Sequence, residues 1–158
     1  MSELQPASAA GQVVDGAHIL PVRVYFEDTD SANMVYHANY LHFMERARAE
    51  VLRLCGVSLS ATMAQSGPES MRYAVSRCAI DYLAQARLDD MLDVRTVARG
   101  IGAAYLDVSQ DIWRGDRPVT KAEVRVVCLG SDGRPRRQPR DLVARLKDLL
   151  PIKPHEKG

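Results

Sequence analysis

The segment EDTDSANMVYHANY, which runs from Glu27 to Tyr40, decides how this chain is arranged. It gathers carboxylates, turn-forming residues and a lone histidine within one short window. A strand-like run over residues 19–26 leads into it, and an amphipathic helix predicted over residues 38–55 leads out of it. The segment therefore aims an acidic side chain and the free N–H groups of a helix N-terminus at one place. Such a place can hold a water molecule beside an electrophilic carbonyl group.

The chain after this segment is predicted to form one long helix and then four strands. Apolar residues recur at three- and four-residue spacing along the helix, namely Tyr40, Phe43, Met44, Ala47, Val51 and Leu54. From Arg72 onward the period changes to two, which predicts strands over about residues 72–82, 92–99, 106–112 and 121–128, each with one apolar face. Short turns between them imply antiparallel neighbours. Residues 58–66 form a short helix or loop, and a final helix over residues 139–150 packs on an outer face.

Length and composition indicate one soluble globular domain. The chain has 158 residues, of which 46% are hydrophobic and 26% charged, and its net charge of +1 gives no reason to expect nucleic acid as a partner. Three cysteines without a CxxC spacing argue against a disulfide framework and a zinc knuckle, and fit reduced thiols in the cytoplasm. No stretch approaches the length of a membrane span, so we expect no membrane insertion.

The predicted boundaries are a disordered N-terminal tail over residues 1–17, one domain over 18–150 and a C-terminal tail over 151–158. Residues 1–16 lack the basic start and apolar run of a signal peptide. A sheet covered by a single long helix leaves one face and its edges open. Because open edges pair with other chains, we expect a homo-oligomer, either a homodimer or a homotetramer.

Five segments in order resemble one enzyme family. They are VRVYFEDTD at 22–30, VYHANY at 35–40, ERAR at 45–48, ARLDD at 86–90 and EVRVVC at 123–128. They are similar to the hot-dog-fold acyl-CoA thioesterases, in the Tol–Pal-associated (YbgC-type) branch of the 4-hydroxybenzoyl-CoA thioesterase family. The resemblance implies an α+β hot-dog fold, in which a five-stranded antiparallel sheet wraps a long central helix, plus a C-terminal helix. It also implies hydrolysis of acyl-CoA or acyl-carrier-protein thioesters, with active sites at the dimer interface and no cofactor or metal.

The same resemblance assigns roles to residues of the opening segment. Asp30, the second acid of the Asp-Thr-Asp triplet, matches the family's catalytic carboxylate. His37 matches a further active-site position, and its backbone N–H matches the oxyanion donor. The substrate-binding site is expected to include Tyr36, Asn39, Tyr40 and Glu45. Two positions depart from the family, since Phe26 replaces a frequent tyrosine and Asn33 a usual glycine; asparagine tolerates the positive φ of that turn.

The chemistry of a thioester suits these residues. A CoA thiol resembles that of cysteine, with a pKa of about 8.5, so the thiolate can leave without a strong general acid. Asp30 can act as general base on water or as nucleophile through a mixed anhydride, and the sequence does not separate these routes. The partial positive charge at the helix N-terminus can stabilise the oxyanion.

Each assignment has a structural alternative. Asp30 is also a typical Asx-turn residue, and His37 can be a capping or interface histidine. Asp28 is interpreted as structural. Glu45, in mid-helix, is the rival catalytic carboxylate, although an ion pair with Arg48 or another arginine is the favoured interpretation. A metal site of His37, His42 and Glu45 is not expected, because a five-residue spacing does not put both rings on one helix face.

Two other functions compete with hydrolysis. One is a non-catalytic binding partner of acyl carrier protein or a phospholipid enzyme, which the departures at Phe26 and Asn33 allow and which Asp30 and His37 argue against. The other is a hot-dog dehydratase, which generally relies on a histidine and a helix acid placed differently. A basic cluster of Arg134, Arg136, Arg137 and Arg140 can meet CoA phosphates, but solvated charge is the favoured interpretation.

Overall fold

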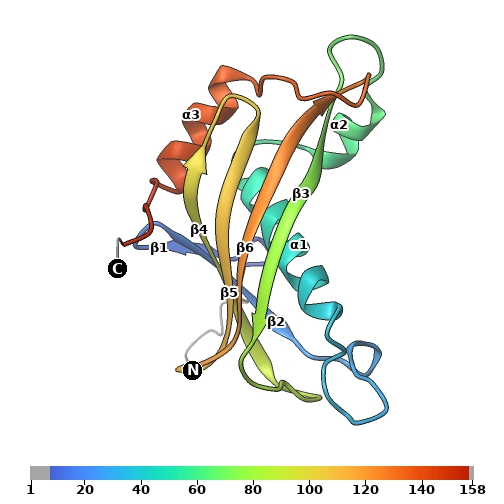
Figure 1. Ribbon diagram of the computed structural model, residues 1–158, viewed down its shortest axis with the longest axis vertical. Coiled ribbons are helices and arrows are strands. Elements are labelled where there is room, and N and C mark those ends of the chain that lie inside the picture. The colour runs from blue at the N-terminus through green and yellow to red at the C-terminus, as the bar shows by residue number, and fades with distance from the viewer. Residues whose placement is uncertain (1–7, 157–158) are drawn as a thin grey trace, which may run out of the picture.

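A computed structural model describes residues 8–156 of the chain (Figure 1). The elements are β1 (Gln12–Val14), β2 (Ala17–Arg23), a 3₁₀ turn (Phe26–Asp28), α1 (Asn39–Leu54), α2 (Leu59–Ala64), β3 (Met71–Tyr82), β4 (Met91–Ile101), β5 (Tyr105–Arg114), β6 (Arg117–Gly130) and α3 (Arg140–Leu149). All neighbouring strands are antiparallel, in the order β1-β2-β4-β5-β6-β3. Among the described residues, no helix is both long and apolar enough to cross a bilayer.

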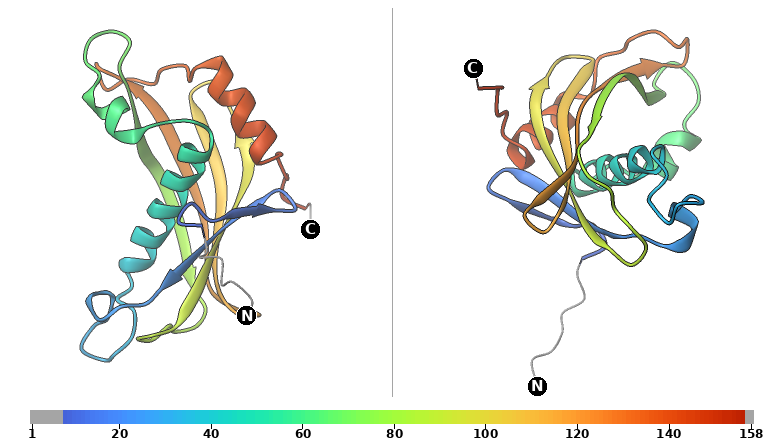
Figure 2. Two further views of the ribbon diagram at one scale, coloured as in Figure 1. Left: turned by 180° about the vertical axis from the view of Figure 1, so that it is seen from behind. Right: turned by 60° about the horizontal axis from the view of Figure 1, so that its bottom comes forward.

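The curved sheet wraps around α1, as the two views of Figure 2 show. This confirms the predicted α+β hot-dog fold. The sheet has six strands and not five, because Gln12–Val14 forms the extra edge strand β1. This strand lies within the segment predicted to be a disordered tail. Residues 1–7 of that predicted tail, and residues 157–158 at the other end, lie outside the described residues.

The apolar stripe of α1 fills the space inside the sheet. Phe43, Met44 and Ala47 are fully buried against Leu92, Val94, Val108 and Ile112 of the strands. At the end of the helix the buried position is Cys55 and not Leu54, since Leu54 is 43% exposed and Cys55 is 3% exposed. The prediction of Leu54 as a core residue is therefore wrong, since the step from Val51 to its buried neighbour is four residues and not three.

Helix α3 lies on the same side of the sheet as α1, and not on the outer face as predicted. Leu142, Leu146 and Leu150 form a second apolar cluster with Val51 and Cys55 at the end of α1. Ala98 of β4 joins this cluster and points to the same face as Leu92 and Val94. The following residues run along the sheet, where the N–H of Lys153 donates to the carbonyl of Ala98 at 2.9 Å. Helix α3 thus closes the end of the core.

Strand β3 is twelve residues long and forms one edge of the sheet. The predicted apolar face of this strand is not buried in a single chain, because Val75 to Ala79 are all exposed. A register shift against β6 lies between Val75 and Arg77. A long, open edge of this kind presents a row of unpaired backbone groups to any second strand that meets it.

Candidate functional site

The loop after β2 holds Asp30 in a tight hairpin. The N–H of Asp30 donates to the carbonyl of Met34 at 2.8 Å, and Asn33 occupies the left-handed region with φ 58°, as predicted for this turn. Oδ1 of Asp30 accepts the N–H of Ala32 at 2.8 Å and that of Met34 at 3.4 Å. Within residues 8–156, Oδ2 makes no hydrogen bond to protein. The Asx-turn interpretation is therefore correct for one oxygen, and the other oxygen is free to act on a water or a carbonyl.

Asp28, the first acid of the triplet, has a structural role. It is 6% exposed, and its Oδ2 accepts the N–H of Tyr25 at 2.8 Å. Its backbone carbonyl accepts the N–H of Tyr36 at 2.9 Å, which pins the two sides of the loop together. Asp28 thus fixes the loop, as interpreted from the sequence, while the half-buried Asp30 keeps its free oxygen.

The helix α1 begins directly after this loop. The N–H of Asn39 donates to the carbonyl of Tyr36 at 2.8 Å, whereas the N–H groups of His37 and Ala38 find no acceptor among the described residues. The carbonyl of His37 accepts the hydroxyl of Tyr82 at 3.1 Å, and its exposed ring lies edge-on to Tyr36 with ring centres 4.5 Å apart. The structure therefore leaves free backbone donors at the helix N-terminus, in the same loop as Asp30.

Ala86 joins this loop to the helix. Its carbonyl accepts the N–H of Val35 at 2.9 Å, and its N–H donates to the hydroxyl of Tyr40 at 3.2 Å. Both partners are buried, with Ala86 at 0% and Tyr40 at 3% exposure, and burial raises the pKa of the Tyr40 hydroxyl. The contacts of Tyr40 are thus internal ones, whereas Tyr36 is 47% exposed beside the loop.

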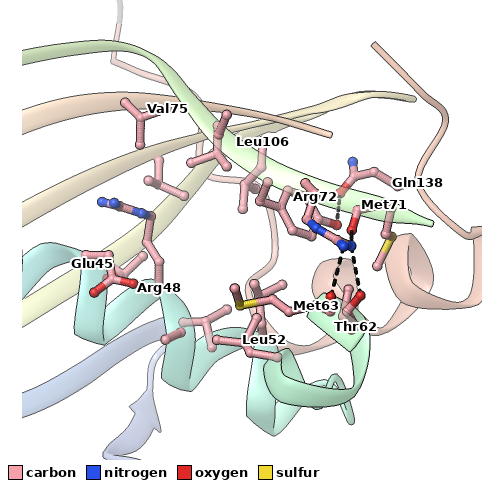
Figure 3. A pocket seen from close by; sticks show the side chains of 18 residues that line it. Glu45, Arg48, Leu52, Thr62, Met63, Met71, Arg72, Val75, Leu106 and Gln138 are labelled. Atoms are coloured by element: carbon pink, nitrogen blue, oxygen red, sulfur yellow. Dashed lines mark hydrogen bonds between the residues drawn. The ribbon is translucent and has the colours of Figure 1, made fainter. Parts of the chain in front are cut away.

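An apolar cavity of about 330 Å³ opens farther along α1 (Figure 3). Its walls come from α1 between Glu45 and Leu52, from α2 and from the first half of β3, and Leu106, Val108 and Val126 complete the lining. Glu45 and Arg48 lie at one end, and Gln138 lies at the other. Since a helix rises about 1.5 Å per residue, Glu45 lies about 9 Å along the axis from the start of α1.

A buried polar cluster supports the charged end of this cavity. Arg48 donates to Oε1 of Gln110 at 2.8 Å, and Gln110 donates to the carbonyl of Met44 and to Oγ1 of Thr96, both at 3.0 Å. Burial lowers the pKa of the Arg48 guanidinium, and the nearby Glu45 carboxylate opposes that shift. The expected ion pair of Glu45 does not form among residues 8–156, and the side-chain hydrogen bond of Arg48 goes to Gln110.

Comparison with known proteins places this geometry in a family. Residues 24–152 match the family model for the thioesterase-like superfamily. The acyl-CoA thioesterase YbgC of Haemophilus influenzae is 38% identical over 117 residues, which span 74% of this chain and 84% of that protein. The acyl-CoA thioester hydrolase YbgC of Escherichia coli O6:H1 is 41% identical over 129 residues, or 80% of this chain and 93% of that one.

The chain belongs to the thioesterase-like superfamily, in its YbgC branch. It is therefore a thioester hydrolase by family. A probable thioesterase from Bartonella henselae superposes with a TM-score of 0.73 at 32% identity, covering 78% of this chain and 99% of that one. A 1,4-dihydroxy-2-naphthoyl-CoA thioesterase from Synechocystis superposes with a TM-score of 0.76 at 20% identity, covering 84% and 97%, which supports the fold alone.

The structure brings most of the predicted site residues of this thioesterase together, but it places Glu45 apart from them. Asp30, Tyr36, His37, Asn39 and Tyr40 all lie in or beside the loop and the start of α1, and Glu45 lies on the exposed rim of the cavity. Their roles toward substrate stay predictions. Of the basic cluster, Arg136 is engaged internally, since it donates to the carbonyl of Ser70 at 2.7 Å and pairs with Glu69 at 3.1 Å.

The sequence analysis of this thioesterase missed two residues that line the cavity, Arg72 and Gln138, and one that bonds to a lining residue, Gln110. Gln110 carried a signal, because it occupies the apolar phase of β5 between Val108 and Ile112, where a polar residue must find buried partners. No sequence signal indicated Arg72 or Gln138. Arg72 begins an alternating strand, and Gln138 lies among prolines and arginines, so only the tertiary structure brings both to the cavity.

The Tyr40–Ala86 hydrogen bond generates a stability prediction for the thioesterase. Tyr40→Phe leaves the buried N–H of Ala86 without a partner, so we expect the free energy of unfolding to fall by about 1–3 kcal/mol. Urea denaturation of both proteins measures this change. Tyr36→Phe is the matched control, because the exposed Tyr36 ring sits outside the core, and it should leave stability unchanged. Equal stability of Tyr40→Phe and the natural protein would contradict the bracing role of this bond.

Proposed function

We propose that this thioesterase hydrolyses acyl-CoA thioesters to the free acid and CoA, with Asp30 at the centre of the reaction. The observation that carries the proposal is the hairpin that places Asp30, with one free carboxylate oxygen, in the same loop as the free N–H groups of His37 and Ala38. The names of the YbgC relatives, which act on acyl-CoA thioesters, support the substrate class.

The Asp30 carboxylate and the N–H groups at the start of α1 have different roles in the proposed reaction. Oδ2 of Asp30 either takes a proton from the attacking water or attacks the carbonyl carbon itself, giving a mixed anhydride that water then opens. In both routes the carbonyl oxygen becomes negative as the new bond forms, and the N–H groups at the start of α1 stabilise it. The C–S bond then breaks and the CoA thiolate leaves with the bonding electrons. Acyl carrier protein can present the same thioester, so it stays a second source of substrate.

The cavity beyond the helix start is the proposed place for the acyl group. Its lining is largely apolar, which matches a hydrocarbon chain and not the charged nucleotide of CoA. In one chain, however, the cavity begins about 9 Å along α1 from the helix start. A second copy can shorten this path.

A homodimer through the open edge of β3 brings catalytic loop and cavity together. Antiparallel pairing of two β3 strands about Ser76 and Arg77 sets Met71 of one copy beside Tyr82 of the other, since their positions are symmetric about that centre. Tyr82 bonds to His37, and Met71 lines the cavity. We therefore infer that each active site combines the Asp30 loop of one subunit with the cavity of the other.

Loss of the Asp30 carboxylate tests the proposed chemistry. In Asp30→Asn the hairpin can keep its acceptor oxygen, while the basic and nucleophilic group is gone, so we expect kcat to fall by at least about 10²-fold. Release of free thiol from acyl-CoA measures it, with Glu45→Gln as the matched control. Turnover that survives in Asp30→Asn and collapses in Glu45→Gln would instead make Glu45 the catalytic acid. Absence of turnover in the natural protein would favour the carrier-protein binding role.

His37 tests whether the backbone or the imidazole matters. His37→Ala keeps the backbone N–H that we propose as oxyanion donor, so kcat should fall by less than about tenfold, whereas loss of an oxyanion donor itself costs about 10²–10³. The same thiol-release assay measures this, with circular dichroism to verify that the helix is intact. A loss as large as that of Asp30→Asn would assign the chemistry to the imidazole.

Mixed dimers test the shared site. Ala74 lines the cavity, so Ala74→Phe should fill it and abolish turnover of long acyl-CoAs while sparing acetyl-CoA. A dimer of one Asp30→Asn subunit and one Ala74→Phe subunit, purified through two different tags, should regain about half of the natural long-chain activity. The reason is that one of its two sites then has both an intact carboxylate and an open cavity. If each subunit used its own cavity, the mixed dimer would be inactive toward long chains.

A further inference from the structure

Helix α2 covers the cavity with little packing of its own. It has six residues, Leu59–Ala64, and none of them is buried. Leu59, Thr62 and Met63 line the cavity beneath, yet the side chain of Met63 is 68% exposed. Isolated helices of this length are not stable in water, so the position of α2 depends on contacts from elsewhere.

One arginine supplies those contacts. Nη1 of Arg72 donates to the carbonyls of Thr62 and Met71, both at 2.8 Å, and Nη2 donates to those of Met63 at 2.9 Å and Gln65 at 3.0 Å. Three of these carbonyls lie at the C-terminal end of α2. That of Thr62 also accepts the N–H of Gln65 at 3.2 Å, whereas those of Met63 and Gln65 accept no other hydrogen bond from the described residues. Figure 3 shows the guanidinium reaching from the strand to the α2 backbone. Among the described residues, Arg72 forms no ion pair, and both of its Nη atoms donate to backbone carbonyl groups.

We propose that Arg72 is a positioning residue that holds α2 as the roof of the cavity, and that it thereby determines acceptance of long aliphatic acyl groups. This inference rests on the proposed function, in which the cavity receives the acyl chain. A long chain reaches under α2 and contacts Leu59 and Met63 there, whereas an acetyl group ends before the cavity. The roof contributes to the binding of the first substrate and not to that of the second.

The geometry requires arginine at this position. The guanidinium is planar and presents five donors in a fixed fork, so it can serve carbonyls of two separate segments at once. A lysine at position 72 has a single ammonium on a flexible stem and cannot reproduce that fork. Arg72→Met keeps the aliphatic stem beside the cavity and removes only the donors, which separates positioning from filling.

Arg136, which lies between β6 and α3, offers a matched control because it bonds to the connection between α2 and β3. It donates to the carbonyl of Ser70 and pairs with Glu69, so it fastens the end of the loop that follows α2. Its side chain is not among those that line the cavity, and its hydrogen bonds go to Ser70 and Glu69 and not to the residues of α2. Arg136→Met removes the same kind of group from the segment between β6 and α3, and it leaves the hydrogen bonds of Arg72 to α2 in place.

The experiment measures KM and kcat for acetyl-, hexanoyl-, decanoyl- and tetradecanoyl-CoA. We expect Arg72→Met to raise KM for the two longer substrates about tenfold, as loss of charged hydrogen bonds to the roof implies, with kcat and the acetyl-CoA constants unchanged. Arg72→Lys should lie between Arg72→Met and the natural protein. Arg136→Met should leave the chain-length profile intact. An equal change for all chain lengths, or an equal effect of Arg136→Met, would overturn the proposal.

A double-mutant cycle adds a readout that general destabilisation does not move. Met63→Ala should by itself raise KM for decanoyl-CoA, but it should add nothing in the Arg72→Met background, because the roof is then already displaced. Additive effects would contradict the proposal. The affinity for decanoate and for hexanoate, measured by calorimetry, follows the roof without requiring turnover. Loss of decanoate binding in Arg72→Met would support the role of Arg72 even if the natural protein hydrolysed nothing, and unchanged binding would refute it.

Discussion

The main chain of one small residue carries the constraint on which the position of the Asp30 loop depends. Ala86 presents its carbonyl to Val35 and its N–H to Tyr40, and all three are buried. A buried backbone group without a partner costs about 1–3 kcal/mol, so the loop and the first turn of α1 cannot shift separately from the segment between β3 and β4. This attachment sets the distance between the Asp30 hairpin and the helix N-terminus. The two groups that the proposed reaction needs are thereby fixed before any substrate arrives.

Much of the fold could be predicted because the spacing of apolar residues within each helix or strand indicates its type. The stripe of α1 and the alternation of β4, β5 and β6 each bury one face, and a period of 3.6 or 2 reports that directly. Strand β1 had no such signal, because its three residues are all exposed and pair only along one edge with β2. The position of α3 also escaped prediction. The apolar residues of α3 predict that one face of the helix is buried. Only the tertiary contact with Val51 and Cys55 determines which side of the sheet α3 covers.

The candidate site divides in the same way. Asp30 and His37 lie within one short segment. The turn-forming residues and the predicted helix start were therefore enough to predict that the two residues lie close together. The cavity is assembled from α1, α2, β3 and the segment before α3, which are far apart in the chain. No local pattern joins Arg72 to Thr62, since the guanidinium bonds to backbone and backbone carries no residue-type signal. Glu45 shows the opposite error, because its helix position predicted an ion pair with Arg48 or another arginine, whereas Arg48 bonds to the distant Gln110 and no ion pair of Glu45 forms among the described residues.

The two ends of the site therefore rely on different kinds of interaction. The end with the Asp30 loop is held to the core by the buried hydrogen bonds of Ala86, and in the proposed reaction its geometry is shared by every substrate. The roof of the cavity is held by the guanidinium of Arg72, and none of the residues of α2 is buried. Stability is not uniform across a structure, and elements with few buried contacts move at the lowest cost. Under the proposed function, a site built in this way keeps its chemistry constant while the roof adapts to the acyl group. Changes in chain-length preference are then expected to arise in residues 57–72 and not in the hairpin of Asp30.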